Sequence, residues 1–201
     1  EYKGLMIELN EATLIIPISI ESEDRRSNTY TTLKYLFKNL QTNILIFESS
    51  KANQVDKILS ELDHNNNYVY YKFIKNDSNV FHRTKILNEM LNIVNTPITI
   101  NYDIDILLKP QVYKKACNLI TDGYDLVYPY FWGDSQYQVS YTGRSKILKT
   151  QNLKFLTNED YKIARSEFGH CQFFNTESYI AGGMENENFI SYAPEDQERG
   201  Y

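Results

Sequence analysis

Short apolar runs alternate with amphipathic segments through the first half of the chain. The run at 12–20, ATLIIPISI, is continuous and rich in β-branched residues, as is typical of a strand buried on both faces. The polar stretch at 21–27 is predicted to be a loop. From Asn28 to about Leu40, leucine and phenylalanine recur at helical spacing behind a plausible N-cap, so this segment is predicted to be a helix.

The same alternation continues to the middle of the chain. Apolar runs predict further strands at 43–48, 68–74 and 96–103, and amphipathic spacing predicts helices at 52–62 and 84–94. Strands that alternate with helices of about ten residues predict an α/β fold, with a mostly parallel sheet joined by right-handed crossovers and flanked by helices.

The second half is less regular. It predicts a helix at 110–119, a strand at 124–129, a helical or mixed segment at 154–168, and a helix or turn from Phe173 to Met184. No internal repeat, low-complexity segment or clear linker interrupts the 201 residues, so one domain is expected.

Composition narrows the classes of partner. The formal charge of -5 offers no basic face for nucleic acid, so an anionic ligand must be held by local arginines, lysines, backbone amides or a metal. No apolar run approaches membrane-spanning length, and no signal sequence opens the chain. Cys117 and Cys171 form neither a disulfide framework nor a zinc pattern, which fits a reducing compartment. The predicted location is therefore cytoplasmic, with peripheral attachment to the inner face of the membrane left open.

Candidate chemistry first emerges in the segment N-Y-D-I-D-I-L-L-K-P at 101–110. If the chain is extended there, Asp103 and Asp105 project to one side and Ile104 to the other. Two such anions repel each other unless a proton or a cation offsets them, and Mn²⁺ or Mg²⁺ prefers oxygen ligands. A solvated turn often gives the same D-x-D pattern by chance, so the doublet taken alone favours such a turn.

Four segments in order give the doublet a context. They are Ile16-Pro17 followed by Arg25-Arg26, the segment F-H-R-T-K-I-L-N at 81–88, Asp103-Ile104-Asp105 with Pro110, and the stretch from Gly182-Gly183 to Glu195-Asp196. Together they resemble the motifs of GT-A-fold glycosyltransferases. The resemblance is strongest to the β-1,4-galactosyltransferase and bacterial chondroitin-polymerase-like group, which is glycosyltransferase family 2-like.

The resemblance implies one GT-A, Rossmann-like domain over 1–201. A nucleotide-binding half at 1–110 would end in the D-x-D, and an acceptor-binding half would follow at 111–201. The implied activity is inverting, metal-dependent transfer of a sugar, from a nucleotide-sugar such as a UDP-sugar to a carbohydrate acceptor, in bacterial polysaccharide or glycan synthesis. The implied nucleotide-binding residues are Pro17, Arg25, Glu48, Arg83 and Asp103, with Asp103 and Asp105 as ligands of Mn²⁺ or Mg²⁺. For Glu48, a contact with uracil or ribose and a solvated strand end are both open.

The second carboxylate pair falls where the group places its acceptor site. Asp196 would be the general base, and Glu195, Tyr192 and Gly183 would bind the acceptor, although adjacent carboxylates also often serve only as partners of a helix dipole. The tryptophan of the group's motif is Tyr192 here, and its glycine pair is replaced by Ala193-Pro194. The group's further metal ligand, usually a histidine, lies downstream of this motif, so a chain truncated at its C-terminus is expected.

Two other classes stay open. A sugar nucleotidyltransferase also uses a metal on an α/β sheet, but it usually carries a glycine-rich loop after its first strand, and the segment from Pro17 to Arg25 has no glycine. A non-catalytic protein that binds nucleotide-sugars or carbohydrates on the same scaffold would tolerate the Ala193-Pro194 substitution. Nucleotide hydrolysis, with and without manganese, separates such a protein from an enzyme.

Overall fold

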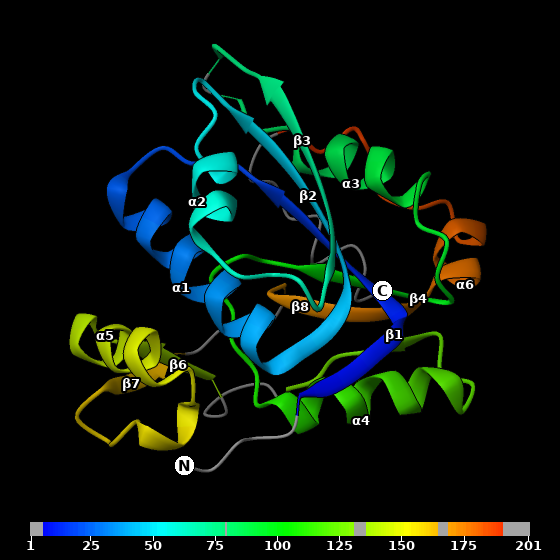
Figure 1. Ribbon diagram of the computed structural model, residues 1–201. Coiled ribbons are helices and arrows are strands. Elements are labelled where there is room, and N and C mark those ends of the chain that lie inside the picture. Colours follow the sequence, from blue (N-terminus) through cyan, green and yellow to red (C-terminus); the bar gives the residue numbers. More distant parts are fainter. Residues whose placement is uncertain (1–5, 79, 131–135, 165–168, 191–201) are drawn as a thin grey trace.

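The structure, a computed structural model, describes residues 6–78, 80–130, 136–164 and 169–190. Its centre is a six-stranded sheet in the order β3-β2-β1-β4-β8-β5 (Figure 1). β1 to β4 are parallel, and β8 runs antiparallel between β4 and β5. The prediction of a mostly parallel α/β sheet is confirmed. The strands are β1 (Ile7–Ile18), β2 (Leu40–Ser50), β3 (Tyr68–Lys75), β4 (Ile98–Tyr102), β5 (Leu126–Val127) and β8 (Cys171–Asn175).

Helices cover both faces of this sheet. α1 (Glu23–Asn39), α2 (Val55–Glu61) and α4 (Pro110–Thr121) share one hydrophobic core with one face, whereas α3 (Arg83–Leu91) and α6 (Thr176–Ala181) pack on the other. In β1, Leu14 and Ile16 belong to the first core and Ile15 to the second. This double coverage explains why the strands read as continuous apolar runs.

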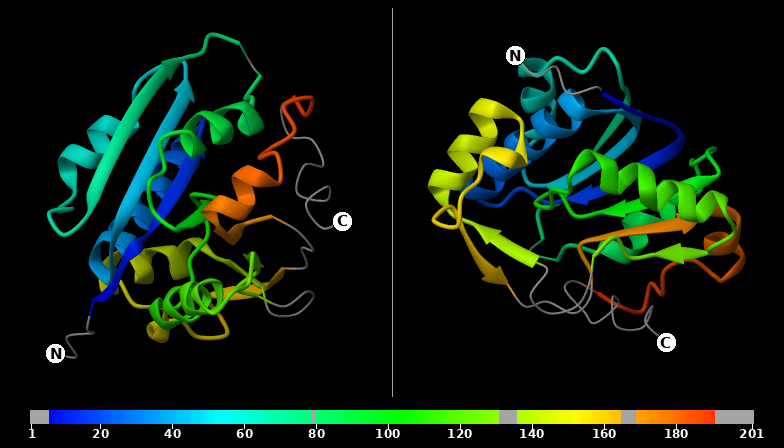
Figure 2. Two further views of the ribbon diagram at one scale, coloured as in Figure 1. Left: turned by 90° about the vertical axis from the view of Figure 1, so that its right-hand side faces the viewer. Right: turned by 90° about the horizontal axis from the view of Figure 1, so that it is seen from below.

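A smaller unit lies beside α1. It contains the two-stranded sheet of β6 (Gln136–Val139) and β7 (Tyr161–Ala164), with α5 (Tyr141–Thr150) and the short 3₁₀ helix η1 (Leu153–Phe155). Arg144 of α5 donates to Asp24 of α1 at 2.7 Å and to Asn28 at 2.8 Å, which ties the unit to α1. The ribbon views show how the unit lies against the main sheet and its helices (Figure 2). Of the expectation of a helical or mixed segment at 154–168, the described residues fit the mixed alternative, because they turn through η1 and then form β7.

Two differences from the predicted elements bear on the site. The stretch at 21–27, expected to be a loop, is largely helical, because the Ser22 side chain accepts from the Arg25 N–H at 3.1 Å and caps α1. Cys171–Asn175, expected to lead into a helix or turn, is the strand β8 and pairs with β4.

Candidate functional site

The candidate site lies where the connections of the sheet change direction. The chain leaves β1 toward β2 on one side, and β4 lies on the other side of β1. In open α/β sheets, ligands bind outside the carboxyl ends of the strands at such a switch point. Arg25 comes from the first turn of α1, just after β1, and Asp103 directly follows β4. The two segments therefore meet at the carboxyl ends of the parallel strands, where this rule places a ligand.

Buried tyrosines hold the turn that follows β4. Tyr102 donates to the carbonyl of Ile106, and its hydroxyl lies 2.8 Å from that of Tyr113. Tyr35 of α1 donates to the carbonyl of Leu108 at 2.9 Å. Burial raises the pKa of Tyr102 and Tyr113 well above the ordinary value, so both stay neutral hydrogen-bond donors. Three of the chain's 17 tyrosines thus serve to fix this turn.

Asp103 is held by the protein on both carboxylate oxygens. Arg83, from the start of α3, donates to Oδ1 at 2.9 Å, and the backbone N–H of His170 donates to Oδ2 at 3.2 Å. The same guanidinium nitrogen of Arg83 also donates to Asn101 at 3.2 Å. The Arg83 side chain is only 9% exposed and that of Asp103 is 32% exposed, so the guanidinium is largely removed from water while the carboxylate keeps some access to solvent.

Asp105 has a looser environment. Its Oδ2 lies 3.5 Å from Nη1 of Arg25, and its side chain is 45% exposed. Partial removal from water and, secondly, the nearby Asp103 charge raise the pKa of the Asp105 carboxyl, and Arg25 opposes that rise. The doublet is therefore close enough for its two charges to interact, as the sequence predicted.

The extended conformation from which this proximity was predicted is not found, however. β4 ends at Tyr102, and Asp103 to Asp105 lie in a turn rather than in an extended strand. The backbone N–H of Ile106 donates to the carbonyl of Asp103 at 3.1 Å, and Ile104 is buried in the core beneath the turn. Burial of Ile104, not strand alternation, leaves both aspartates on the outer side.

The donor set fits a hard divalent cation in part. Two mutually repelling carboxylates on a turn suit Mn²⁺ or Mg²⁺, and Mg²⁺ is usually held by one or two carboxylates completed by substrate phosphates and water. Among the residues that the structure describes, no group of three or more His, Cys, Asp or Glu side chains could hold a metal ion. The chain's described residues can thus supply two ligands, and phosphate and water would supply the rest.

The structure does not bring Glu48 to the surface of this site. Its side chain is fully buried and accepts from the backbone N–H groups of Gln54 and Val55, at the start of α2, and from the Tyr71 hydroxyl at 2.7 Å. These contacts belong to a residue that supports α2, and a nucleotide-binding role for Glu48 stays untested. Pro17 is buried one residue before the end of β1.

Arg26 points to a different partner from Arg25. Its guanidinium lies 3.7 Å from Glu23 and 3.7 Å from Glu61 of α2. Of the two adjacent arginines, only Arg25 is therefore paired with a carboxylate of the turn.

The second and fourth sequence motifs are joined by α3. Asn88 donates to the carbonyl of Glu185 at 2.9 Å and accepts from its N–H at 2.9 Å. One turn earlier in α3, Thr84 donates to the carbonyl of Phe189 at 3.0 Å. The same helix begins with Arg83, so it links the segment at 184–190 to the carboxylates after β4.

Gly183 sits at the point where α6 ends. Its φ of 98° is in the left-handed region, and the N–H of Met184 returns to the carbonyl of Tyr179 at 3.2 Å. An acceptor-binding role for Gly183 stays a prediction. Tyr192, Glu195 and Asp196 lie outside the described residues.

Sequence reasoning missed His170. It precedes β8, and the backbone N–H of Asp103 donates to its carbonyl at 2.8 Å, next to the bond that it returns to Asp103. Since β8 was not predicted as a strand, nothing in the sequence placed His170 opposite the D-x-D.

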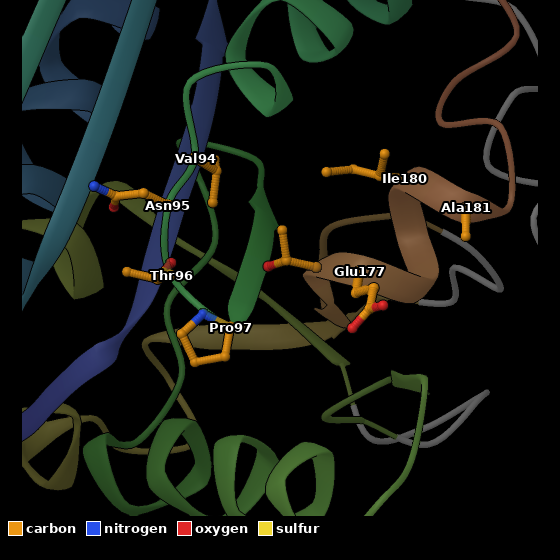
Figure 3. Close-up of a pocket in the computed structure, with 8 residues that line it drawn as sticks. Val94, Asn95, Thr96, Pro97, Glu177, Ile180 and Ala181 are labelled. Atoms are coloured by element: carbon orange, nitrogen blue, oxygen red, sulfur yellow. The ribbon is translucent and has the colours of Figure 1, made fainter.

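A separate open groove lies at the amino end of β4 (Figure 3). It has a volume of about 640 Å³ and lies between α6 and the loop that precedes β4. Among the residues that line it, all of them described, the one charged side chain is Glu177. Its negative charge disfavours a diphosphate there, so an anionic donor is better placed at the opposite edge, beside the two arginines.

Comparisons with known proteins support the fold. No protein-family model matches the sequence, and a search of curated proteins found no match. Among solved structures, the chain is similar to the mannosyltransferase PcManGT from Pyrobaculum calidifontis, in complex with GDP-Man and Mn²⁺. The TM-score is 0.57 at 12% identity, over 89% of this chain and 48% of that one.

It is also similar to residues 1–349 of TarS from S. aureus, with a TM-score of 0.58 at 14% identity over 92% of this chain and 52% of that one. The same TarS segment in complex with UDP-GlcNAc gives a TM-score of 0.57. The chain thus spans about half the length of these structures. In the part of the chain that the structure describes, no helix has the length and apolarity needed to cross a membrane, and the cytoplasmic location stays a prediction. The fold is that of the GT-A-type glycosyltransferases.

Proposed function

We propose that the protein is an inverting, metal-dependent glycosyltransferase that moves a sugar from a nucleotide-sugar to a carbohydrate acceptor. The observation that carries the proposal is the meeting of Arg25, Arg83, Asp103 and Asp105 at the switch point of a GT-A-type sheet. Two guanidinium groups and two carboxylates at one edge suit a ligand that brings both phosphates and a divalent cation.

In this proposal the donor half binds the nucleotide-sugar by offsetting the negative charge of its diphosphate. Asp103 and Asp105 would hold Mn²⁺ or Mg²⁺, which when bound supplies a Lewis acid that neutralises the diphosphate leaving group. Arg83 and Arg25 carry forked donors that suit phosphate oxygens. Pro17, at the end of β1, would border the nucleotide, and Glu48 would support that region through α2.

The acceptor half rests on the sequence resemblance. Asp196 would remove the proton from the acceptor hydroxyl, and Glu195, Tyr192 and Gly183 would bind the acceptor. A single base opposite a departing diphosphate gives in-line displacement with inversion at the anomeric carbon. The division into a donor half at 1–110 and an acceptor half at 111–201 belongs to this proposal. Asn88 and Thr84 support it because they join the segment at 184–190 to the helix that carries Arg83.

The ligands of the two neighbouring structures indicate which donors to test first. The PcManGT structure contains GDP-Man and Mn²⁺, and a TarS structure contains UDP-GlcNAc. We favour a UDP-sugar for this chain and test it against a GDP-sugar. Because the chain spans about half of these neighbours, the acceptor and linkage of the whole protein lie beyond the proposal.

The test is a calorimetric titration with UDP-GlcNAc and GDP-Man, with Mn²⁺ and again with a chelator, followed by detection of released nucleotide. A transferase binds one of the two donors in a Mn²⁺-dependent way and slowly hydrolyses it. Binding without hydrolysis or transfer to any acceptor would indicate a non-catalytic binding protein. Absence of binding to either donor would contradict the proposal.

A further inference from the structure

His170 stands beside the two carboxylates in a backbone conformation that few side chains adopt. Its φ is 70°, and it follows Gly169 with a φ of 92°. Left-handed residues other than glycine persist only where their surroundings hold them, and they are frequent at functional sites. Here the surroundings are the two backbone hydrogen bonds with Asp103, which fix His170 from both its N–H and its carbonyl.

Packing also fixes the orientation of the ring. The Tyr130 ring meets it edge-on, with ring centroids 5.8 Å apart and an interplanar angle of 66°. The Tyr130 hydroxyl in turn donates to the carbonyl of Gly169. The imidazole is therefore held against a tyrosine, and the backbone of the same residue is held against Asp103.

One atom of this well-held ring has no role within the described protein. Nε2 of His170 is buried, yet it has no hydrogen-bond partner in the part of the chain that the structure describes. Most buried polar atoms are paired, so an unpaired one requires an explanation. Through its two hydrogen bonds with Asp103, His170 belongs to the same site as the carboxylates.

We propose that Nε2–H of His170 donates a hydrogen bond to a diphosphate oxygen of the bound nucleotide. The inference rests on the proposed function, because it takes the nucleotide-sugar as the ligand of this edge. Diphosphate oxygens that are ionised at neutral pH only accept hydrogen bonds, so they need further donors beside the two arginines. The bond would satisfy Nε2, which the described protein leaves unpaired, and it would make His170 a binding residue for the leaving group.

Three variants separate this role from a structural one. H170G removes the ring but accepts a positive φ without strain, H170F keeps the ring against Tyr130 without an N–H, and H170N keeps a donor on a residue that tolerates the left-handed region. H64A is the matched control. His64 packs on Phe37 and lies just before β3, at the amino ends of the parallel strands and so away from the candidate site. Affinity is measured for UDP and uridine, or for GDP and guanosine where the unmodified protein prefers guanine.

H170G and H170F should weaken the diphosphate by about ten- to a hundredfold, the scale of one hydrogen bond to a charged group, and leave the nucleoside unchanged. H170N should recover part of the loss, and H64A should match the unmodified protein. Without nucleotide, H170G should melt no lower than the unmodified protein, since both the unpaired nitrogen and the strained φ are gone.

Some contrary results would overturn only the role assigned to His170, and another would overturn the proposed function as well. Unchanged diphosphate affinity, or equal losses for diphosphate and nucleoside, would overturn the assignment of His170 alone. A loss confined to the nucleotide-sugar, with UDP unaffected, would also overturn it and place Nε2 on a sugar hydroxyl. If the unmodified protein binds neither nucleotide, the proposed function fails and the assignment fails with it.

Discussion

Asp103 and Asp105 lie two residues apart in one turn, but their surroundings leave the two carboxylates with different freedom to turn toward a ligand. Asp103 is engaged by a buried arginine and by a backbone N–H, whereas Asp105 is half-exposed and has a longer contact, of 3.5 Å, with Arg25. A carboxylate whose oxygens are already engaged is a positioned anchor, and a looser one can turn toward an incoming cation. We therefore expect substitution at the two positions to have different effects.

The Asp105→Asn variant should lose most Mn²⁺-dependent nucleotide binding while its fold stays intact. The change removes one charged oxygen ligand but no core contact, because Asp105 is half-exposed. We expect the affinity for UDP or GDP with Mn²⁺ to fall by at least about tenfold, and binding with a chelator to change little. Calorimetry under both conditions checks this, and undiminished Mn²⁺-dependent affinity would contradict the metal assignment.

The same variant gives a pH test that needs no ligand. Asp105 has a folded-state pKa above its ordinary value of 3.8, so the folded protein holds this proton more tightly than the unfolded chain does. Its contribution to stability is therefore fully present below the unfolded pKa and is lost as pH rises through the folded pKa. Asp105→Asn should melt higher than the unmodified protein at pH 7.5, and the difference should shrink toward pH 4.5. A variant that melts lower at pH 7.5 would show that the ionised carboxylate stabilises the fold.

Arg83 should matter to stability as well as to binding. Arg83→Ala leaves Asp103 and Asn101 without their buried donor, so we expect a loss of about 2–4 kcal/mol in the free energy of unfolding. Arg83→Lys keeps the charge without the fork and should recover part of that stability. Denaturant titration measures the loss. Nucleotide titration should show UDP weakened more than uridine by both variants, and equal losses would point to a purely structural role.

At the scale of elements, the parallel half of the sheet was predictable and the antiparallel part was not. The runs in β1 and β2 are long and apolar because these strands are covered on both faces, and the edge strand β3 shows alternation along its length. β8 is only five residues long and reads C-Q-F-F-N, with the polar Gln172 buried opposite Asn101 of β4. Neither its length nor its pattern separates such a strand from the start of a helix.

The missed strand explains the missed site residue. His170 meets Asp103 only because β8 pairs with β4 across many intervening residues. Arg83 and Asp103, by contrast, lie in segments whose types were predicted, so their meeting at one edge followed from the parallel order of the strands. The pairings that no local pattern announces are those between distant, short strands.

Asn88 offers a test of how α3 and the segment at 184–190 act together. Asn88→Ala leaves the N–H and carbonyl of Glu185 without this partner, and Glu185 is buried. We expect a loss of about 2–3 kcal/mol in the free energy of unfolding and faster amide exchange at 184–190. Asn92→Ala, at an exposed position at the end of the same helix, is the control and should change neither. Unaltered exchange in Asn88→Ala would mean that the segment is held by other contacts.

For the whole molecule, the GT-A-type sheet fixes where a nucleotide can bind but not what is done with it. Fold and function are separable, and PcManGT and TarS, at 12–14% identity, show only a shared fold with this chain. The donor side can be argued from described contacts. The acceptor side depends on Glu195 and Asp196, which lie outside the described residues, so it is known here only through their sequence motif.

Asp196→Asn is the prediction that distinguishes an enzyme from a binding protein. Asparagine keeps the size of the side chain and most of its hydrogen bonding but cannot take a proton at neutral pH. If Asp196 is the general base, donor affinity should be retained and sugar transfer should fall about a hundredfold or more. Glu195→Gln should instead raise the acceptor concentration needed for transfer, with a smaller effect on slow hydrolysis of the donor. Because the chain spans about half of its structural neighbours, the assay uses the full-length protein and follows transfer to an acceptor together with donor binding. Transfer at the unmodified rate by Asp196→Asn would remove the base from the proposal, while the binding site beside Asp103 would still stand on its own tests.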